Sequence, residues 1–250
     1  MTDVDRYRVF GETTDAVERI APGFFAKHHE AEHVARYRWA ARIARIRGRS
    51  VLDAACGTGY GSRMLSEAGA ARVWSVDVNA AALDFARTAY AGPRYVRADA
   101  LALPLRARSV DVAVSLETIE HVLDGQGFLR ELRRGLRDGG VLALSSPNVV
   151  LTGNTNPYHV HEMTLEELSA KLESTGFRLT GVWGQYWRLP VRRGVWRLKG
   201  LGRLAFYVSK WPVVWKLPER WGFRPLYWCV RAVAGDAPVA PGSPRPAHAR

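Results

Sequence analysis

Residues 51–61 read Val-Leu-Asp-Ala-Ala-Cys-Gly-Thr-Gly-Tyr-Gly, and this stretch decides the fold. A short apolar run ends at Asp53, and glycines follow at alternate positions, Gly57, Gly59 and Gly61. Glycine permits a positive φ, and its missing side chain lets a ligand approach the backbone. Ligands of open α/β sheets bind beyond the carboxyl ends of the strands. The stretch therefore predicts a buried strand that leads into a ligand-binding loop.

Apolar runs with the length of strands alternate with segments of helical period along the chain. We expect strands at 50–54, 72–78, 95–98, 110–116, 141–146, 177–187 and 226–231, and helices at 29–47, 62–68, 80–90, 127–136 and 164–174. Thr164 and Glu167 form a capping box at the start of the last helix. The turn Asp138-Gly139-Gly140 is expected to end the fourth helix. This alternation predicts an α/β fold with a parallel sheet and helices on both faces.

Acidic residues stand at the ends of four expected strands, Asp53, Asp77, Asp99 and Glu117. A carboxylate at Asp77 can accept hydrogen bonds from a ribose diol, and one at Asp99 can accept from an adenine amino group. The apolar pair Ala100-Leu101 would then lie against the adenine ring. The glycine spacing is G-x-G-x-G and lacks the third spaced glycine of the dinucleotide form G-x-G-x-x-G. This spacing disfavours NAD and favours S-adenosylmethionine.

Residues 51–61 resemble motif I of class I S-adenosylmethionine-dependent methyltransferases, of the UbiG-like or type 11 group. Residues 115–122 resemble the S-x-E-x-x-E-H-V segment of this group, and residues 136–140 resemble its L-K-P-G-G turn, with Asp138 in place of proline. The resemblance covers roughly residues 30–182. It implies S-adenosylmethionine as the cofactor. It also implies a Rossmann-like, doubly wound, three-layer α/β/α fold, whose seven-stranded sheet is mostly parallel with an antiparallel last strand.

The resemblance also implies roles for individual residues. The backbone of Gly57 and Gly59 would face the methionine part of the cofactor, and Asp53 would help to position its amino group. Asp77 would bind the ribose, and Asp99 would contact the adenine. The other cofactor contacts expected from the matched segments are Ala55, Tyr60, Val78, Ala100 and Glu117.

Three histidines are the candidate catalytic residues on the acceptor side, His121, His159 and His161. A sulfonium methyl group is already electrophilic, so the enzyme mainly has to hold the nucleophile in line. A general base is needed only when the acceptor is a weak acid such as an alcohol. His159 and His161 would point the same way from an extended loop. Purely structural roles stay open for all three histidines. Glu162 is nearby, but no metal-ligand motif such as H-E-x-x-H appears, so we expect no metal.

The formal net charge of +12 is concentrated near the C-terminus. Residues 176–231 contain twelve Lys and Arg, a single acid, Glu219, and seven of the nine Trp. Within them, residues 188–225 form a basic, aromatic insert, and 195–211 has the pattern of an imperfect amphipathic helix. The insert is predicted to be a lid that binds an acceptor phosphate or carboxylate, or an interfacial segment on an anionic membrane. Nucleic acid is disfavoured, because no recognised RNA- or DNA-binding module accompanies the high pI.

One domain is expected over residues 1–233, with a helical region at 1–47 and a disordered tail at 234–250 that is rich in Pro, Ala and Gly. The polar start lacks a signal-peptide pattern, and no apolar run approaches the length of a membrane span. The two cysteines fit a reducing compartment. We therefore expect a cytoplasmic protein, or one peripheral to the inner face of the membrane. The sequence does not predict an oligomeric state.

These features predict a methyltransferase of class EC 2.1.1 that acts by in-line displacement, at oxygen, on a small-molecule or glycan-like acceptor. The glycan-like acceptor rests on residues 146–148 and 156–162, which resemble the loop after the fifth strand in family members of sugar and polysaccharide pathways. Nitrogen and carbon acceptors stay open. One alternative is a lipid-linked or prenyl acceptor at an anionic membrane. Another is a non-catalytic partner protein that binds S-adenosylmethionine.

Overall fold

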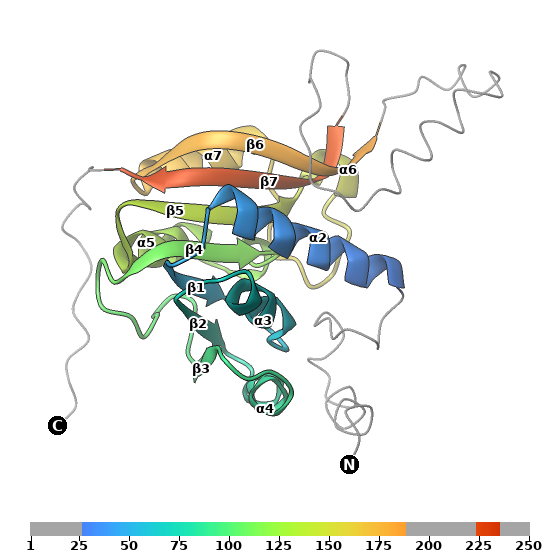
Figure 1. Cartoon of the computed structure of the whole chain (residues 1–250). Helices are drawn as coiled ribbons and strands as arrows, with labels where there is room; N and C mark the ends of the chain where they lie inside the picture. The colour runs from blue at the N-terminus through green and yellow to red at the C-terminus, as the bar shows by residue number, and fades with distance from the viewer. Residues whose placement is uncertain (1–26, 189–223, 236–250) are drawn as a thin grey trace, which may run out of the picture.

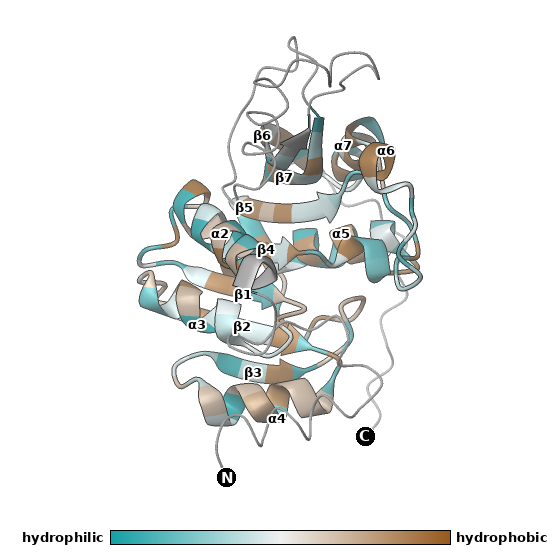
Figure 2. Ribbon diagram, turned by 90° about the vertical axis from the view of Figure 1, so that its right-hand side faces the viewer, coloured by the Kyte–Doolittle hydropathy of each residue, from teal (hydrophilic) through white to brown (hydrophobic). Residues whose placement is uncertain are grey.

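The computed structural model describes residues 27–188 and 224–235 of the chain, and seven strands of this part form one sheet. Figure 2 shows the strands stacked in the order β3-β2-β1-β4-β5-β7-β6, with α4 beside β3 at one end. Strands β1 to β5 pair in parallel, and β7 runs antiparallel to both β5 and β6. This order and direction confirm the predicted Rossmann-like, mostly parallel sheet. The strands are β1 Ser50–Ala54, β2 Arg72–Asp77, β3 Arg94–Arg97, β4 Val110–Leu116, β5 Leu136–Pro147, β6 Phe177–Arg188 and β7 Arg224–Ala234.

Helices cover both faces of the sheet (Figure 1). Neighbouring residues of a strand point to opposite faces, so Val51 and Val112 pack under one helical layer, whereas Leu52 and Ala113 pack under the other. Because both faces are covered, the central strands are apolar at almost every position. The first layer contains α2 (Lys27–Ile43) and α3 (Tyr60–Glu67), and the second contains α5 (Gly125–Gly135) and α7 (Leu165–Ser174). Helix α4 (Ala80–Ala89) packs against β2 and β3.

Side-chain caps explain where three of the helices begin. The side chains of Asn79, Asp124 and Thr164 accept hydrogen bonds from the backbone N–H three residues later, at the starts of α4, α5 and α7. Such caps satisfy backbone donors that have no partner within the helix. The predicted start at Thr164 is confirmed, with the Glu167 N–H donating to its hydroxyl.

Several predicted element bounds differ from the structure, and two of the differences have a clear cause. The first helix ends at Ile43 rather than at residue 47, because Arg45 adopts a positive φ of 50° that a helix does not accommodate. Asp138-Gly139-Gly140 lies within β5, where the pairing with β4 shifts register between Val110 and Val112. The glycines therefore form a bulge that starts the strand, not only a turn that ends the helix. Two short elements were not predicted, the 3-10 turn η2 (Ile119–His121) and α6 (Val149–Thr152).

Most of the insert predicted at 188–225 lies outside the described residues, as do the proposed amphipathic helix at 195–211 and nearly all of the tail at 234–250. Across the part of the chain that the structure describes, no helix combines the length and the apolar character needed to cross a bilayer.

Candidate active site

The loop after β1 carries the glycines at the carboxyl edge of the sheet, and these glycines have different tasks. Ala55, Gly57 and Gly59 all have positive φ, at 60°, 54° and 82°. A Cβ added to Gly57 would meet no atom within 4 Å, so its missing side chain leaves the backbone open to a ligand. A Cβ on Gly59 would lie 2.6 Å from Cβ of Ala86 and 2.9 Å from the ring of Tyr95. Of these two glycines, Gly57 exposes the loop, and Gly59 allows α4 and β3 to pack against it.

Asp53 is completely buried under this loop. Its carboxylate accepts hydrogen bonds from the hydroxyls of Ser62 at 2.6 Å and Tyr37 at 3.2 Å. Burial raises the pKa of Asp53 to about 7, although both hydrogen bonds lower it. The ring of Tyr37 occupies the space that a side chain at Gly61 would fill. Sequence reasoning identified Asp53 but not Tyr37 or Ser62, because nothing in their local pattern indicates these contacts.

Asp77 ends β2 and joins the second strand to the glycine loop. One carboxylate oxygen accepts from the backbone N–H of Gly57 at 2.8 Å, and the other accepts from that of Asn79 at 2.9 Å. A carboxylate has about four acceptor positions, so the single side chain of Asp77 can hold both the glycine loop and the turn after β2. The residue is buried, whereas the adjacent Val78 is 58% exposed. The arrangement holds a rigid acceptor beside the open backbone of Gly57.

The turn after β3 lies next to the end of β2, since the N–H of Ala98 donates to the carbonyl of Asp77 at 3.1 Å. Asp99 is exposed, and its carboxylate accepts from the N–H of Leu101 at 2.8 Å. Leu101 and Val78 are both exposed apolar side chains, and Ala100, which precedes Leu101, is partly buried. Exposed apolar surface beside a carboxylate is suited to the flat face and polar edge of a nucleobase.

The end of β4 is fixed against β5 through Glu117, which has a positive φ of 51°. The hydroxyl of Ser145 donates to the carboxylate of Glu117 at 2.6 Å, and the Glu117 N–H donates to the same hydroxyl at 3.1 Å. The next turn, η2, carries Glu120 and His121. The loop after β5 is tied to this turn, because the N–H of Val160 donates to the carbonyl of Glu120 at 2.7 Å. Two segments distant in the sequence therefore meet at this edge of the sheet.

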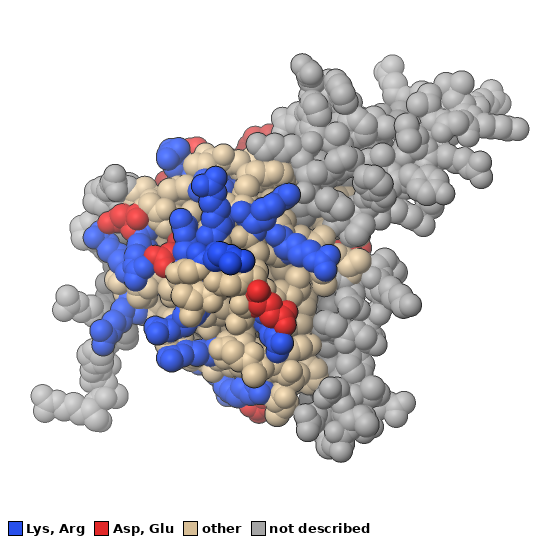
Figure 3. Space-filling model, viewed as in Figure 1, with Lys and Arg blue, Asp and Glu red and all other residues tan. Residues whose placement is uncertain are grey.

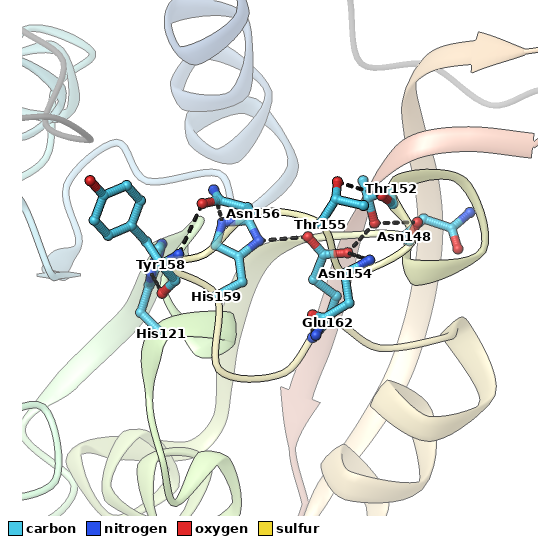
Figure 4. Close-up of polar contacts among 9 residues, drawn as sticks. All are labelled: His121, Asn148, Thr152, Asn154, Thr155, Asn156, Tyr158, His159 and Glu162. Carbon is cyan, nitrogen blue, oxygen red and sulfur yellow. Dashed lines mark hydrogen bonds and ion pairs between the residues drawn. The ribbon is translucent and has the colours of Figure 1, made fainter.

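His159 lies on this loop, and its tautomer follows from its partners (Figure 4). Asn156 accepts the Tyr158 N–H through Oδ1 at 3.0 Å, so its Nδ2 is the atom that lies 2.9 Å from Nε2 of His159. That amide donates, and Nε2 is therefore unprotonated. Nδ1 carries the proton and donates it to Glu162 at 2.6 Å. The buried Glu162 also accepts from the N–H of Asn154 at 3.0 Å.

His121 faces His159 with the ring centroids 4.8 Å apart in an edge-to-face arrangement. Its Nδ1 lies 3.0 Å from the carbonyl of Tyr158, which can only accept, so Nδ1 is protonated. His161 has a different environment: it is exposed, and its Nε2 lies 2.6 Å from the carboxylate of Glu167 on α7. The prediction that His159 and His161 point the same way was wrong, because separate carboxylates orient the two rings. The structure brings together His121 and His159 and places His161 outside the pair.

A buried arginine from α2, Arg36, lies behind this cluster and was not predicted from the sequence. Its guanidinium donates to the side chain of Gln185 on β6 and lies over the ring of Tyr227 on β7, 4.7 Å from the centroid. Burial alone would lower the pKa of Arg36, but the charges around it, Glu117 foremost and also Glu32, raise it. The guanidinium therefore stays charged and joins α2 to the last two strands of the sheet.

Known proteins resemble this chain in sequence and in fold. Residues 52–144 match a family described as "Methyltransferase domain". A Mycolicibacterium smegmatis protein named "Probable S-adenosylmethionine-dependent methyltransferase" is 35% identical over 179 residues, which are 68% of this chain and 67% of the relative. A malonyl-[acyl-carrier protein] O-methyltransferase of Serratia marcescens is 38% identical over 99 residues, 40% of this chain and 38% of that protein. The crystal structure of an S-adenosylmethionine-dependent methyltransferase from Archaeoglobus fulgidus superimposes with a TM-score of 0.60 at 18% identity, covering 91% of this chain and 99% of the other.

Proposed function

Because this chain belongs to the family of class I S-adenosylmethionine-dependent methyltransferases, we propose that it transfers the methyl group to a hydroxyl oxygen of a small-molecule or glycan-like acceptor. The family establishes a methyltransferase with S-adenosylmethionine as its cofactor. The position of the His121–His159 pair carries the proposal for the acceptor. This pair lies after β4 and β5, at the edge of the sheet where the glycine loop after β1 also lies.

We assign the methionine part of the cofactor to the open backbone at Gly57, with Ala55 and Tyr60 beside it. Asp53, which is buried under the glycine loop, helps to position the amino group of the cofactor. The positive charge of that amino group favours the charged form of Asp53. Asp77 receives the ribose hydroxyls, because its buried carboxylate is held rigidly beside the open backbone of Gly57 by the N–H groups of Gly57 and Asn79. The adenine lies at Asp99 and Ala100, against the exposed side chain of Val78. Glu117 closes the site at the end of β4.

A hydroxyl acceptor requires a group that takes its proton, and the His159–Glu162 pair is arranged for this task. Glu162 holds the proton of Nδ1, so Nε2 is the basic nitrogen, as in a histidine oriented by a carboxylate in an acyl-transfer triad. Exchange of the Asn156 amide for the acceptor hydroxyl would bring that hydroxyl to Nε2. The Serratia relative, whose name states an O-methyltransferase, supports oxygen as the methylated atom.

Transfer of labelled methyl from S-adenosylmethionine to a panel of sugars, polyols and phenols tests the proposal. His159→Ala is expected to lower kcat about 10²- to 10⁴-fold, the usual contribution of a general base. His161→Ala is the matched control, since it removes an exposed histidine from the same loop and should leave kcat within about twofold of the wild type. Equal kcat values for the wild type and both variants would rule out a role of His159 in proton transfer.

A lipid-linked acceptor at an anionic membrane is the second candidate, and a basic patch supports it. Lys and Arg side chains gather on the face seen in Figure 3. Among the described residues, Arg45, Arg49 and Arg178 lie close enough to Arg231 for their charges to act on it. Burial and these three cations lower the pKa of Arg231. The patch lies at the start of β1 and β6, away from the glycine loop, so it would anchor the protein rather than bind the acceptor. Co-sedimentation with anionic vesicles, compared with neutral vesicles, tests this anchoring. Binding that is equally weak to both would remove the membrane candidate.

A further inference from the structure

We infer that Glu120, His121 and His159 form a binding site for a divalent transition-metal ion that holds the acceptor hydroxyl. The inference deepens the proposed function and rests on it for the identity of the bound hydroxyl. It replaces the expectation of no metal, which considered only motifs in consecutive sequence. The three residues come from η2 and from the loop after β5, and only folding brings them together.

The geometry gives one ligand atom from each residue, a carboxylate oxygen and two imidazole nitrogens, all within 4.8 Å of one another. Imidazole nitrogen suits zinc, iron, nickel and copper, and two histidines with one carboxylate occur in catalytic zinc and non-haem iron sites. The donor set therefore favours a first-row transition metal over magnesium or calcium, which prefer oxygen ligands. A small inward movement of the side chains would bring the donors to coordination distance.

Glu120 supplies an independent observation. Its side chain is completely buried, and neither carboxylate oxygen has a hydrogen-bond partner among the described residues. A buried carboxylate without a partner is costly, and such groups in proteins are normally paired or coordinate a metal. A cation between Glu120 and the two imidazoles would compensate this cost at the point where the unpaired oxygens lie.

The second nitrogens of the two rings are already held as metal sites require. Nδ1 of His121 donates to the carbonyl of Tyr158, and Nδ1 of His159 donates to Glu162. Ligating histidines almost always donate their other N–H to a carbonyl or carboxylate, which fixes the ring and presents Nε2 to the metal. The amide of Asn156, now 2.9 Å from Nε2 of His159, would turn aside when the metal binds.

The charge balance around the cluster also favours a cation. The charges of Glu117 and Glu162 repel a negative charge on Glu120, and the guanidinium of Arg36 attracts it. Around Glu120, two further carboxylates therefore outnumber one guanidinium in a region of low dielectric constant. A divalent ion would turn this excess of negative charge into an attraction.

Three protein ligands leave coordination positions for the acceptor, and two adjacent hydroxyls of a glycan-like acceptor could occupy two of them. A hydroxyl bound to the metal loses its proton more readily, and the proton passes to water. An oxygen lone pair then forms the new O–CH3 bond, while the electron pair of the S–CH3 bond returns to sulfur and gives S-adenosylhomocysteine. With Nε2 bound to the metal, His159 holds the ion and is no longer the base that takes the proton. Because His159→Ala removes a metal ligand, it is still expected to lower kcat.

The test uses the full chain, stripped with a chelator and titrated with Co²⁺, whose visible absorption reports nitrogen ligands. We expect one equivalent to bind in the micromolar range or tighter, Zn²⁺ to displace it, and Glu120→Gln to weaken binding at least about 100-fold. Glu162→Gln should weaken binding about 10- to 100-fold through the orientation of His159. His161→Ala is the control and should bind as the wild type does. If Glu120→Gln does not fold, as judged by circular dichroism, His121→Asn replaces it.

The outcomes separate this inference from the proposed function. Loss of Co²⁺ binding in Glu120→Gln and His121→Asn but not in His161→Ala supports the site, even if no hydroxyl acceptor is methylated, in which case the proposed function fails alone. Methyl transfer that persists in chelator, together with no Co²⁺ binding or equal binding by all variants, overturns the metal site and leaves His159 as the base.

Discussion

Replacement of Gly61 by alanine should destabilise the folded protein, because this glycine leaves room for the ring of Tyr37, whose hydroxyl donates to Asp53. A Cβ at Gly61 would lie 1.9 Å from a ring carbon of Tyr37, far inside van der Waals contact. Tyr37 is fully packed and lies edge-to-face with Tyr60, at 5.6 Å between ring centroids. The ring therefore has to move, and its hydrogen bond to Asp53 is lost.

The expected loss combines two effects. Insertion of a methyl group into a packed core costs about 1–3 kcal/mol. Loss of a hydrogen bond to a buried carboxylate costs about 1.5–3 kcal/mol. We expect Gly61→Ala to lower the free energy of unfolding by about 3–5 kcal/mol, a large fraction of the stability of a typical domain.

Urea unfolding followed by tryptophan fluorescence measures this loss, and Gly57→Ala is the matched control. Gly57 faces open space, so its substitution costs only the left-handed backbone conformation, about 1–2 kcal/mol. The new methyl group stands where we place the methionine part of the cofactor, so affinity for S-adenosylmethionine should fall at least about tenfold, or 1.4 kcal/mol, in calorimetry. A Gly61→Ala protein within about 1 kcal/mol of the wild type, or a Gly57→Ala protein with unchanged affinity, would refute the roles given to these glycines.

Three further predictions follow from buried charges in the site. Folding raises the pKa of Asp53 from 3.8 to about 7, so the folded state binds more protons than the unfolded state between these pH values. The free energy of unfolding should therefore fall as the pH rises from 4 to 7, by up to about 1.4 kcal/mol per pH unit. In urea unfolding this slope should be smaller in Asp53→Asn, and equal slopes would contradict the raised pKa. Asp77→Ala removes the proposed ribose acceptor and the partner of the Gly57 N–H, so calorimetry should show at least about a tenfold loss of affinity for S-adenosylmethionine. If the variant does not fold, the main role of Asp77 is to stabilise the fold. Arg36→Met leaves the nearby carboxylates of Glu117 and Glu32 without their buried cation and should cost about 3–5 kcal/mol in thermal unfolding, whereas a change under about 1 kcal/mol would show that Arg36 is not needed for charge balance.

Much of the fold could be predicted because the signals are local. The mostly apolar residues 110–116 form β4 with the predicted bounds, and Thr164 caps α7 as its side chain allows. The bulge at 138–140 could not be predicted, since the same glycines suit a turn and a strand irregularity, and only the pairing with β4 distinguishes the two. The end of α2 likewise depends on how the chain turns to enter β1.

The proposed cofactor side of the site follows from the ends of strands. Asp53 is among the last two residues of β1 and Asp77 ends β2, and these strands pair in parallel, so position in the chain was sufficient to place both acids near one edge. The residues that support them were not predicted. Tyr37 comes from a helix before the first strand, and Arg36 meets Gln185 across 149 residues of sequence, separations at which periodicity carries no information.

The sequence by itself determined the parallel sheet, the glycine loop and the acids that follow the strands, because each depends on local backbone preference and on the common direction of parallel strands. Only the tertiary structure decided the proposed acceptor side, where Glu120, His121 and His159 meet and His161 turns to Glu167. Side chains on irregular loops follow no period, and their directions are set by hydrogen-bond partners, here Tyr158 and Glu162, that arrive only when the chain has folded.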